Sequence, residues 1–276
     1  MRRLTGALLA LLGAPGAGAA QLGGELSLGH DSNVANIRDS APQFEDGFSL
    51  VRFQVDEVLA LSASSALLLQ AFGQAQNHVE FQGLNQLKAQ LLARYLLRPG
   101  RGFYVPTLAW SASAAGLAYD SEMRDHSEYR ALFYVDQPLT TQLRTRLSVA
   151  GRWNRDGEAG VFRDSATQFG VDFDWQVLRP LALYAGYQWR SGDFVASGKP
   201  SPAVLAAVPA YAPDDVFEGL TILRQDGHGG IATFGFNYSF SPKTSFDVQV
   251  QRAGFESEFG VRYGRTISIA SLLFRY

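Results

Sequence analysis

Charged residues recur at every second position along two neighbouring segments of the chain. Residues two apart in an extended strand lie on the same face, so these charges would form a ladder. The ladder comprises Arg144, Arg146, Arg152, Asp172 and Asp174, with Arg130 and Asp136 on the preceding segment. Ladders of charge can select permeant ions or anionic solutes at close range. Alternatively, the opposite charges pair across strands and fill a water-exposed interior.

A histidine and a serine two positions apart form a second candidate site. His30 and Ser32 would share one face of a strand, where an imidazole could activate a hydroxyl for attack on an ester. Such chemistry also needs a third group that orients the imidazole. Glu45 or Asp46, at the start of the next predicted strand, could supply it. These residues are therefore a candidate esterase site.

Both candidate sites lie on predicted strands, in which apolar and polar residues alternate. The clearest is the last stretch, 266–276, in which alternate residues form a face suited to lipid: Ser268, Ala270, Leu272, Phe274 and Tyr276. Strands of outer-membrane barrels alternate apolar residues outward with polar residues inward. The terminal aromatic pair, Tyr276 and Phe274, also resembles the insertion signal that the barrel-assembly machinery recognises in bacterial outer-membrane proteins.

About twelve such strands are predicted, and the connections between them alternate in length. Long polar connections are expected at 31–46, 77–83, 119–127, 154–164, 190–229 and 256–264. Short turns are expected at 63–64, 98–102, 136–138, 178–180 and 241–243. Pro106 is placed inside a predicted strand, where it would remove a ladder donor and produce a bulge.

This pattern predicts an all-β fold, a transmembrane antiparallel up-and-down β-barrel of about twelve strands in the bacterial outer membrane. Short turns on one rim and long loops on the other are typical of such barrels. A soluble β-sandwich is the alternative, but it explains neither the terminal aromatic residue nor the loop alternation. A twelve-stranded barrel is wider than a filled eight-stranded one and narrower than a 16-stranded porin. Its strand number therefore does not decide whether the lumen conducts.

The start of the chain predicts export. Arg2 and Arg3 precede an apolar run, 4–12, and small residues follow at 17–20, as in a secretory signal peptide. The prediction is a signal peptide at 1–20 and a barrel at 21–276. Its removal would lower the Lys and Arg count from 24 to 22 against 26 Asp and Glu, a net charge of about −4 that makes nucleic acid an unsuitable partner.

Composition adds few candidates for bound groups. The chain has no cysteine, which excludes disulfides and thiolate metal sites. The four histidines, His30, His78, His126 and His228, have no ligand-motif spacing, so neither a metal nor a cofactor is expected. Outer-membrane lipid is the expected surrounding, and a small solute or a surface or periplasmic partner is possible.

Two resemblances concern the sequence Gly-His-Asp-Ser-Asn-Val at 29–34. It is similar to the Gly-Tyr-Asp-Ser-Asn-Val signature of the barrel domain of surface lipoprotein assembly modifiers and related outer-membrane proteins. That resemblance implies a barrel in which Asp31, Ser32 and Asn33 are turn formers that hydrogen-bond the nearby backbone. The sequence also resembles the His-x-Ser-Asn motif of outer-membrane lipid A deacylases and phospholipases, which implies catalysis by His30 and Ser32.

Three functions follow from these patterns. The first is a narrow diffusion channel, or a structural barrel, with a charged lumen. The second is a partner-binding or assembly barrel of an export or surface system, and the third is a lipid esterase or deacylase. The longest predicted loop, 190–229, contains four prolines and would either fold over the barrel mouth as a constriction or offer an external binding surface.

Overall fold

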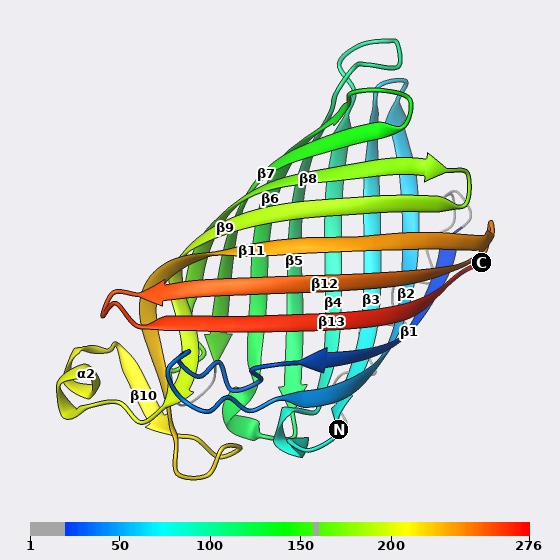
Figure 1. Ribbon diagram of the computed structural model, residues 1–276. Coiled ribbons are helices and arrows are strands. Elements are labelled where there is room, and N and C mark those ends of the chain that lie inside the picture. Colours follow the sequence, from blue (N-terminus) through cyan, green and yellow to red (C-terminus); the bar gives the residue numbers. More distant parts are fainter. Residues whose placement is uncertain (1–19, 157–159) are drawn as a thin grey trace.

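The computed structural model describes residues 20–156 and 160–276, which form a closed antiparallel barrel of twelve strands (Figure 1). The ring consists of β1 (Gln21–Asp31), β2 (Asp46–Ser62), β3 (Ser65–His78), β4 (Gln86–Leu97), β5 (Thr107–Tyr119), β6 (His126–Pro138), β7 (Leu143–Asp156), β8 (Ser165–Leu178), β9 (Leu181–Gly198), β11 (Thr221–Ser241), β12 (Thr244–Ser257) and β13 (Arg262–Arg275). β13 pairs with β1, with Leu272 opposite Leu26, and this pairing closes the ring. The predicted fold class is therefore confirmed.

The two faces of the sheet differ as the alternation predicts. Leu28, Phe53 and Phe234 point outward and are 70%, 69% and 64% exposed, as lipid-facing side chains should be. On the inner face, the hydroxyl oxygens of Ser27 and Ser271 lie 2.8 Å apart and both residues are buried. Closure pairs the backbone N–H and C=O groups between strands, which a sheet in lipid requires. Within the described residues, no helix is both long and apolar enough to span a bilayer.

The short turns gather at one end of the barrel, toward the upper right of Figure 1. In outer-membrane barrels this is the periplasmic end, and the opposite end is the outer one. The predicted alternation in length is not uniform, because the periplasmic turn 98–106 is longer than the outer loop 258–261. Pro106 ends that turn and β5 begins at Thr107, so its placement inside a strand was wrong; proline lacks the N–H that a paired strand position needs.

The longest predicted loop also has different bounds. β9 and β11 continue through much of 190–229 and pair residue by residue as far as Gly198 and Thr221. The loop is therefore 199–220, and it contains the helix α2 (Pro202–Ala207) and the short strand β10 (Ala210–Pro213), which pairs only with β11. These parts of β9 and β11 were predicted as loop because they are rich in glycine and charged residues. The predicted signal peptide lies outside the described residues except for Ala20.

Gly192 lies where this hairpin leaves the ring. Its φ of +128° is a conformation that L side chains rarely adopt, and an added Cβ would lie 2.4 Å from the backbone oxygen of Ser165. Only glycine therefore fits at this position. Phe194, two residues further along β9, packs against Tyr263 of β13 with ring centroids 5.2 Å apart, so the hairpin leans over the outer mouth.

We expect Gly192→Ala to lower the free energy of unfolding by about 1–3 kcal/mol, because it forces a strained backbone against Ser165. Urea unfolding of the reconstituted barrel, followed by tryptophan fluorescence, measures the effect. Gly198→Ala is the matched control, since Gly198 is on the same strand and an added Cβ would meet no atom within 4 Å. Equal unfolding midpoints for the two variants would contradict the claim that only glycine fits at position 192.

Candidate pore lining and outer lid

An arginine wall lines one side of the lumen. The register from β4 to β9 directs alternate residues inward, and six of them are arginines: the exposed Arg144 and five that are partly buried, Arg94, Arg130, Arg146, Arg152 and Arg190. We call these five residues the arginine wall. Arg130, Arg146 and Arg152 were predicted as lumen residues, whereas Arg190 was assigned to a loop. The periodicity of β9 could have revealed Arg190, because it continues the inward phase of Tyr184 and Gln188.

Tyr134 of β6 lies between two members of the arginine wall. Its ring centroid is 5.6 Å from the guanidinium carbon of Arg94 and 4.6 Å from that of Arg146, a cation–π geometry. Arg146 also forms an ion pair with Asp136, with Nη2 and Oδ2 3.0 Å apart. Cross-strand pairing of opposite charges was one of the two expectations for these residues, and this pair partly neutralises the wall near the periplasmic end.

The remaining predicted charge pairs are not formed in the predicted way. Arg144 and Arg146 lie opposite Asp174 and Asp172 in the β7–β8 register, but no ion pair joins them among the described residues. Arg130 donates a hydrogen bond to the Gln168 amide oxygen at 3.2 Å and has no carboxylate partner within the described ranges. Cross-strand neighbours therefore share a face without pairing, because long arginine side chains reach other acceptors.

Asp164, in the outer loop 160–164, bridges two members of the arginine wall. Its Oδ2 is 2.7 Å from Nη2 of Arg152 and 3.5 Å from Nη2 of Arg190. Burial raises the pKa of the Asp164 carboxyl, although Arg152 and Arg190 act in the opposite direction. Two guanidinium groups thus share one carboxylate, and the wall keeps excess positive charge at its outer end.

The Nε atoms of all five members of the arginine wall are buried and have no hydrogen-bond partner among the described residues. These Nε atoms are out of reach of a solute, but the side chains of Arg146, Arg152 and Arg190 keep 40%, 21% and 13% of their surface exposed. Guanidinium donors suit carboxylate and phosphate oxygens. This is the strongest chemical feature of the lumen.

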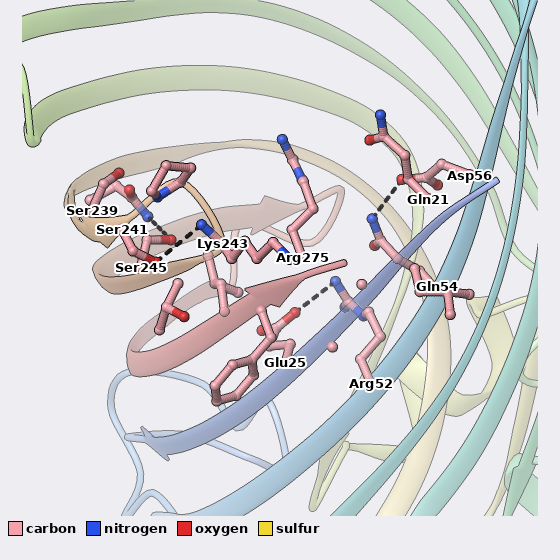
Figure 2. A pocket seen from close by; sticks show the side chains of 18 residues that line it. Gln21, Glu25, Arg52, Gln54, Asp56, Ser239, Ser241, Lys243, Ser245 and Arg275 are labelled. Atoms are coloured by element: carbon pink, nitrogen blue, oxygen red, sulfur yellow. Dashed lines mark hydrogen bonds and ion pairs between the residues drawn. The ribbon is translucent and has the colours of Figure 1, made fainter. Parts of the chain in front are cut away.

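The opposite wall, formed by β11 to β13 and β1 to β3, carries acidic groups. They are Glu25, Asp31, Asp46, Asp56 and Asp247. Figure 2 shows the periplasmic end of this wall, where Glu25 lies 3.2 Å from Arg52 beside a cavity of about 430 Å³. Two of these acidic groups, Glu25 and Asp31, pair with Arg52 and Arg265 of the same wall, so this side of the lumen carries only a small excess of acidic groups.

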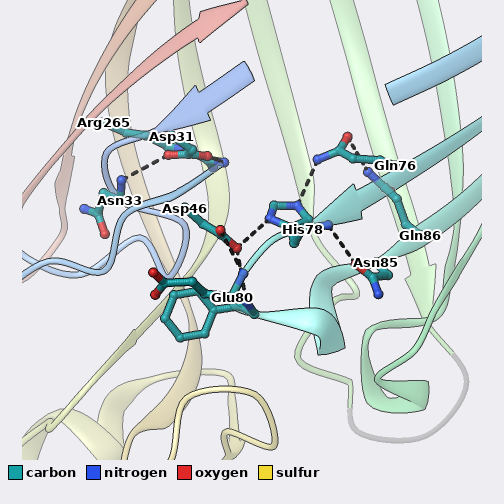
Figure 3. A network of polar contacts seen from close by, with 10 residues as sticks. Asp31, Asn33, Asp46, Gln76, His78, Glu80, Asn85, Gln86 and Arg265 are labelled. Atoms are coloured by element: carbon teal, nitrogen blue, oxygen red, sulfur yellow. Dashed lines mark hydrogen bonds and ion pairs between the residues drawn. The ribbon is translucent and has the colours of Figure 1, made fainter. Parts of the chain in front are cut away.

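At the outer end, a polar network holds the loops 32–45 and 79–85 (Figure 3). Asp46 accepts hydrogen bonds from the backbone amides of Glu80 and Phe81, each at 3.1 Å, and its carboxylate lies 3.2 Å from Nδ1 of His78. Asp31 accepts from Nε of Arg265 at 2.8 Å. These contacts give both loops a fixed position above the barrel mouth.

We call residues 199–220 the outer lid. It leaves the ring at β9 and returns at β11, yet its tip, 214–220, contacts loops that lie halfway round the ring, between β3 and β4 and between β5 and β6. The lid therefore crosses the outer mouth of the barrel. Covering the mouth is one of the two roles predicted for the longest loop.

Phe217 fixes the lid tip in a small apolar core. Its side chain is 2% exposed, and its ring stacks on Phe44 at 5.5 Å and packs on Phe81 at 4.9 Å. Ala35, Ile37 and Leu84 complete the core from the loops 32–45 and 79–85. Three outer loops thus bury apolar side chains together above the lumen.

A buried ion pair holds the lid tip on its other side. Asp214 accepts a hydrogen bond from Nη2 of Arg124 at 2.6 Å, and both side chains are buried. Arg124 belongs to the short helix η3 (Glu122–Arg124) between β5 and β6. Asp214 also accepts from the backbone amides of Val216 and Phe217. Sequence reasoning assigned no role to Arg124, since nothing local predicts its distant partner.

The structure separates His30 from Ser32. His30 points outward, and its Nε2 lies 3.7 Å from Oε2 of Glu45, which was predicted to orient it. The Ser32 hydroxyl oxygen instead accepts a hydrogen bond from the Thr266 amide at 2.9 Å. Among the described residues, no hydrogen bond joins His30 to Ser32.

The turn-forming interpretation of this segment is consistent with the structure. The Asn33 amide donates to Asp31 Oδ1 at 3.0 Å, and the Ile37 amide donates to Asn33 Oδ1 at 2.8 Å. Asn33 is fully buried and also donates to the Gly264 carbonyl oxygen. These side chains satisfy backbone groups where β1 ends and the loop begins.

We expect Ser32→Ala to leave any phospholipid hydrolysis by the reconstituted protein unchanged, because the hydroxyl oxygen accepts a backbone bond and has no contact with the imidazole. Release of acyl chains from labelled phospholipid vesicles measures this. Ser40→Ala, an exposed serine of the same loop, is the matched control. Hydrolysis that disappears in Ser32→Ala and persists in Ser40→Ala would favour the esterase function instead.

The predicted insertion signal lies at the closing seam of the barrel. The Tyr276 amide donates to the Leu22 carbonyl oxygen at 2.8 Å, and its exposed ring lies 5.8 Å from Nζ of Lys243. Phe274 stands opposite Gly24 on the outward phase of β13. Recognition of these residues by the assembly machinery stays a prediction.

Together, the ring, the lipid-facing band and the polar interior define an outer-membrane β-barrel. Solved structures with the same fold include an outer-membrane channel from Pseudomonas putida F1, with a TM-score of 0.62 and 11% identity over 96% of this chain and 97% of that one. The NanC porin has a TM-score of 0.54 and 8% identity over 91% of this chain and 98% of that one. No protein-family model matches the chain, and no curated protein matches it in sequence. The shared property is the fold.

Proposed function

We propose that the protein is a narrow diffusion channel of the outer membrane that favours small anionic solutes. The observation that carries this proposal is the arginine wall, in which Arg94 and Arg130 have no carboxylate partner among the described residues. Fixed positive charge at close range would raise the local concentration of anions that pass along the wall. The barrels of similar fold named above are channels or porins, which supports the same conclusion.

The acidic wall opposite gives the proposed channel a second property. Cationic and acidic sides across one lumen produce a transverse field, which would orient a solute that carries a carboxylate at one end and donors at the other. Asp247 accepts a hydrogen bond from the Tyr184 hydroxyl at 2.8 Å, so part of the acidic wall is already occupied. The arginine wall keeps guanidinium groups without a carboxylate partner in the described part of the chain, and we therefore expect a preference for anions.

In this proposal the outer lid limits the size of solutes. It crosses the mouth and is held by the Phe217 core and the Arg124–Asp214 pair. The experiment is to insert the folded protein, without residues 1–20, into a planar bilayer and record single-channel currents. Small, reproducible steps are expected. A barrel that is folded by circular dichroism and carries no current would contradict the channel and favour a partner-binding barrel.

A further inference from the structure

An apolar cavity of about 570 Å³ lies at the outer end, separate from the arginine wall. It is bounded by the loop 32–45, both ends of the outer lid, the outer ends of β9 and β11, and the segment 259–263. Its walls include Phe44, Leu220, Leu223 and Val261. The volume is that of a typical small-molecule site. Because none of its lining residues belongs to the arginine wall, an inference about this cavity does not depend on the proposed channel function.

The charged groups of the cavity are all of one sign. Arg38 and Lys199 line it, and none of its lining residues is acidic. Both side chains belong to exposed residues, and neither forms an ion pair within the part of the chain that the structure describes. A solute with a negative charge would therefore find two cations without competing carboxylates.

A buried polar pair contributes a further donor to the lining. Gln225, 1% exposed, donates from Nε2 to the Tyr263 hydroxyl oxygen at 2.7 Å. The Tyr263 side chain is also buried, and no acceptor for its hydroxyl proton is found among the described residues. A tyrosine hydroxyl can donate one hydrogen bond and accept others. The proton of Tyr263 is therefore left for an acceptor in the cavity.

We infer that this cavity binds an organic carboxylate with an apolar body, at the outer surface. The apolar body would fill the space between Phe44, Leu223 and Val261, and the carboxylate would meet Arg38 and Lys199. An inorganic anion has no apolar part, so the apolar walls of the cavity would remain in contact with water. A neutral hydrocarbon would leave the two cations and the Tyr263 hydroxyl without an acceptor. Only a molecule with both parts satisfies the whole lining.

The test uses 2-naphthoate as the probe and the full barrel in lipid nanodiscs, which avoids detergent in the cavity. Probe fluorescence is titrated with the protein, and 2-naphthylmethanol serves as the neutral analogue of similar shape. We expect saturable binding of the carboxylate and binding of the alcohol that is weaker by about tenfold or more, the value of a hydrogen bond to a charged group.

Variants locate the site. Arg38→Gln with Lys199→Gln should weaken 2-naphthoate binding by about tenfold, whereas Arg101→Gln with Arg155→Gln removes two exposed arginines elsewhere and should leave it unchanged. Val204→Trp, which fills the cavity from α2 without changing charge, should abolish binding. Equal affinity in all variants, or equal binding of acid and alcohol, would overturn the inference. Circular dichroism of each variant confirms that the barrel remains folded.

Discussion

Replacing Asp214 with alanine is expected to raise the single-channel conductance by roughly twofold or more, because the lid would no longer be held across the mouth. Asp214 is the acceptor for Arg124 and for the amides of Val216 and Phe217. Removing one partner of a buried ion pair costs about 3–5 kcal/mol, since the other charge stays buried without compensation. The small Phe217 core cannot be expected to offset that loss.

The barrel itself should remain intact in this variant. Asp214 contacts the lid, the end of β9 and η3, and it takes no part in the strand pairing that closes the ring. Amide hydrogen exchange should therefore accelerate at 214–220 and stay slow in the strands. Glu218→Gln is the control, because Glu218 is an exposed carboxylate of the same tip. An unchanged conductance together with fast exchange at the tip would show that the lid does not limit flow.

Replacing Arg94 and Arg130 together with glutamine is expected to reduce the anion preference of the channel by about fivefold or more. Both lie on the arginine wall, and neither has a carboxylate partner among the described residues. A unit charge attracts an anion at 4 Å by about 1 kcal/mol even in bulk water, which corresponds to a factor of about five. The loss of two such charges should thus dominate the selectivity.

The matched control removes one charge of each sign. Asp136→Asn with Arg146→Gln eliminates an ion pair of the same region and leaves the net charge of the lumen unchanged. Reversal potentials in a salt gradient compare the two double variants with the wild type. We expect a large shift for Arg94 and Arg130 and a small one for the ion pair. Similar shifts for both would mean that individual pairs, and not the net charge of the wall, set the selectivity.

The sequence predicts the barrel well because its signal is local. Alternation within β7, β8 and β13 decides which side chains meet lipid, and closure then follows from the need to pair every backbone group. The same alternation correctly places Arg146 and Asp136 on one inner face, where they pair. A strand interrupted by glycine is harder to recognise, so the extension of β9 beyond Arg190 was taken for a loop.

The outer lid could not be predicted from local patterns. Asp214 binds Arg124, which is 90 positions away, and Ser197 near the end of β9. Phe217 packs against residues of two other loops. Turn residues and prolines indicate that 199–220 is not a strand, but they do not indicate what it packs against. The hydrogen bond of Ser32 could not be predicted for the same reason, because its hydroxyl oxygen reaches the Thr266 amide only when β13 pairs with β1.

The most direct test of an anion-favouring channel is the reversal potential of the wild-type protein in a planar bilayer across a potassium chloride gradient. The arginine wall predicts a potential with the sign of chloride preference at neutral pH, and a smaller one at high salt, where charges are screened. A potential of zero, or one with the sign of potassium preference, would contradict the account. Either result would mean that the acidic wall or the lid, and not the arginines, governs what passes.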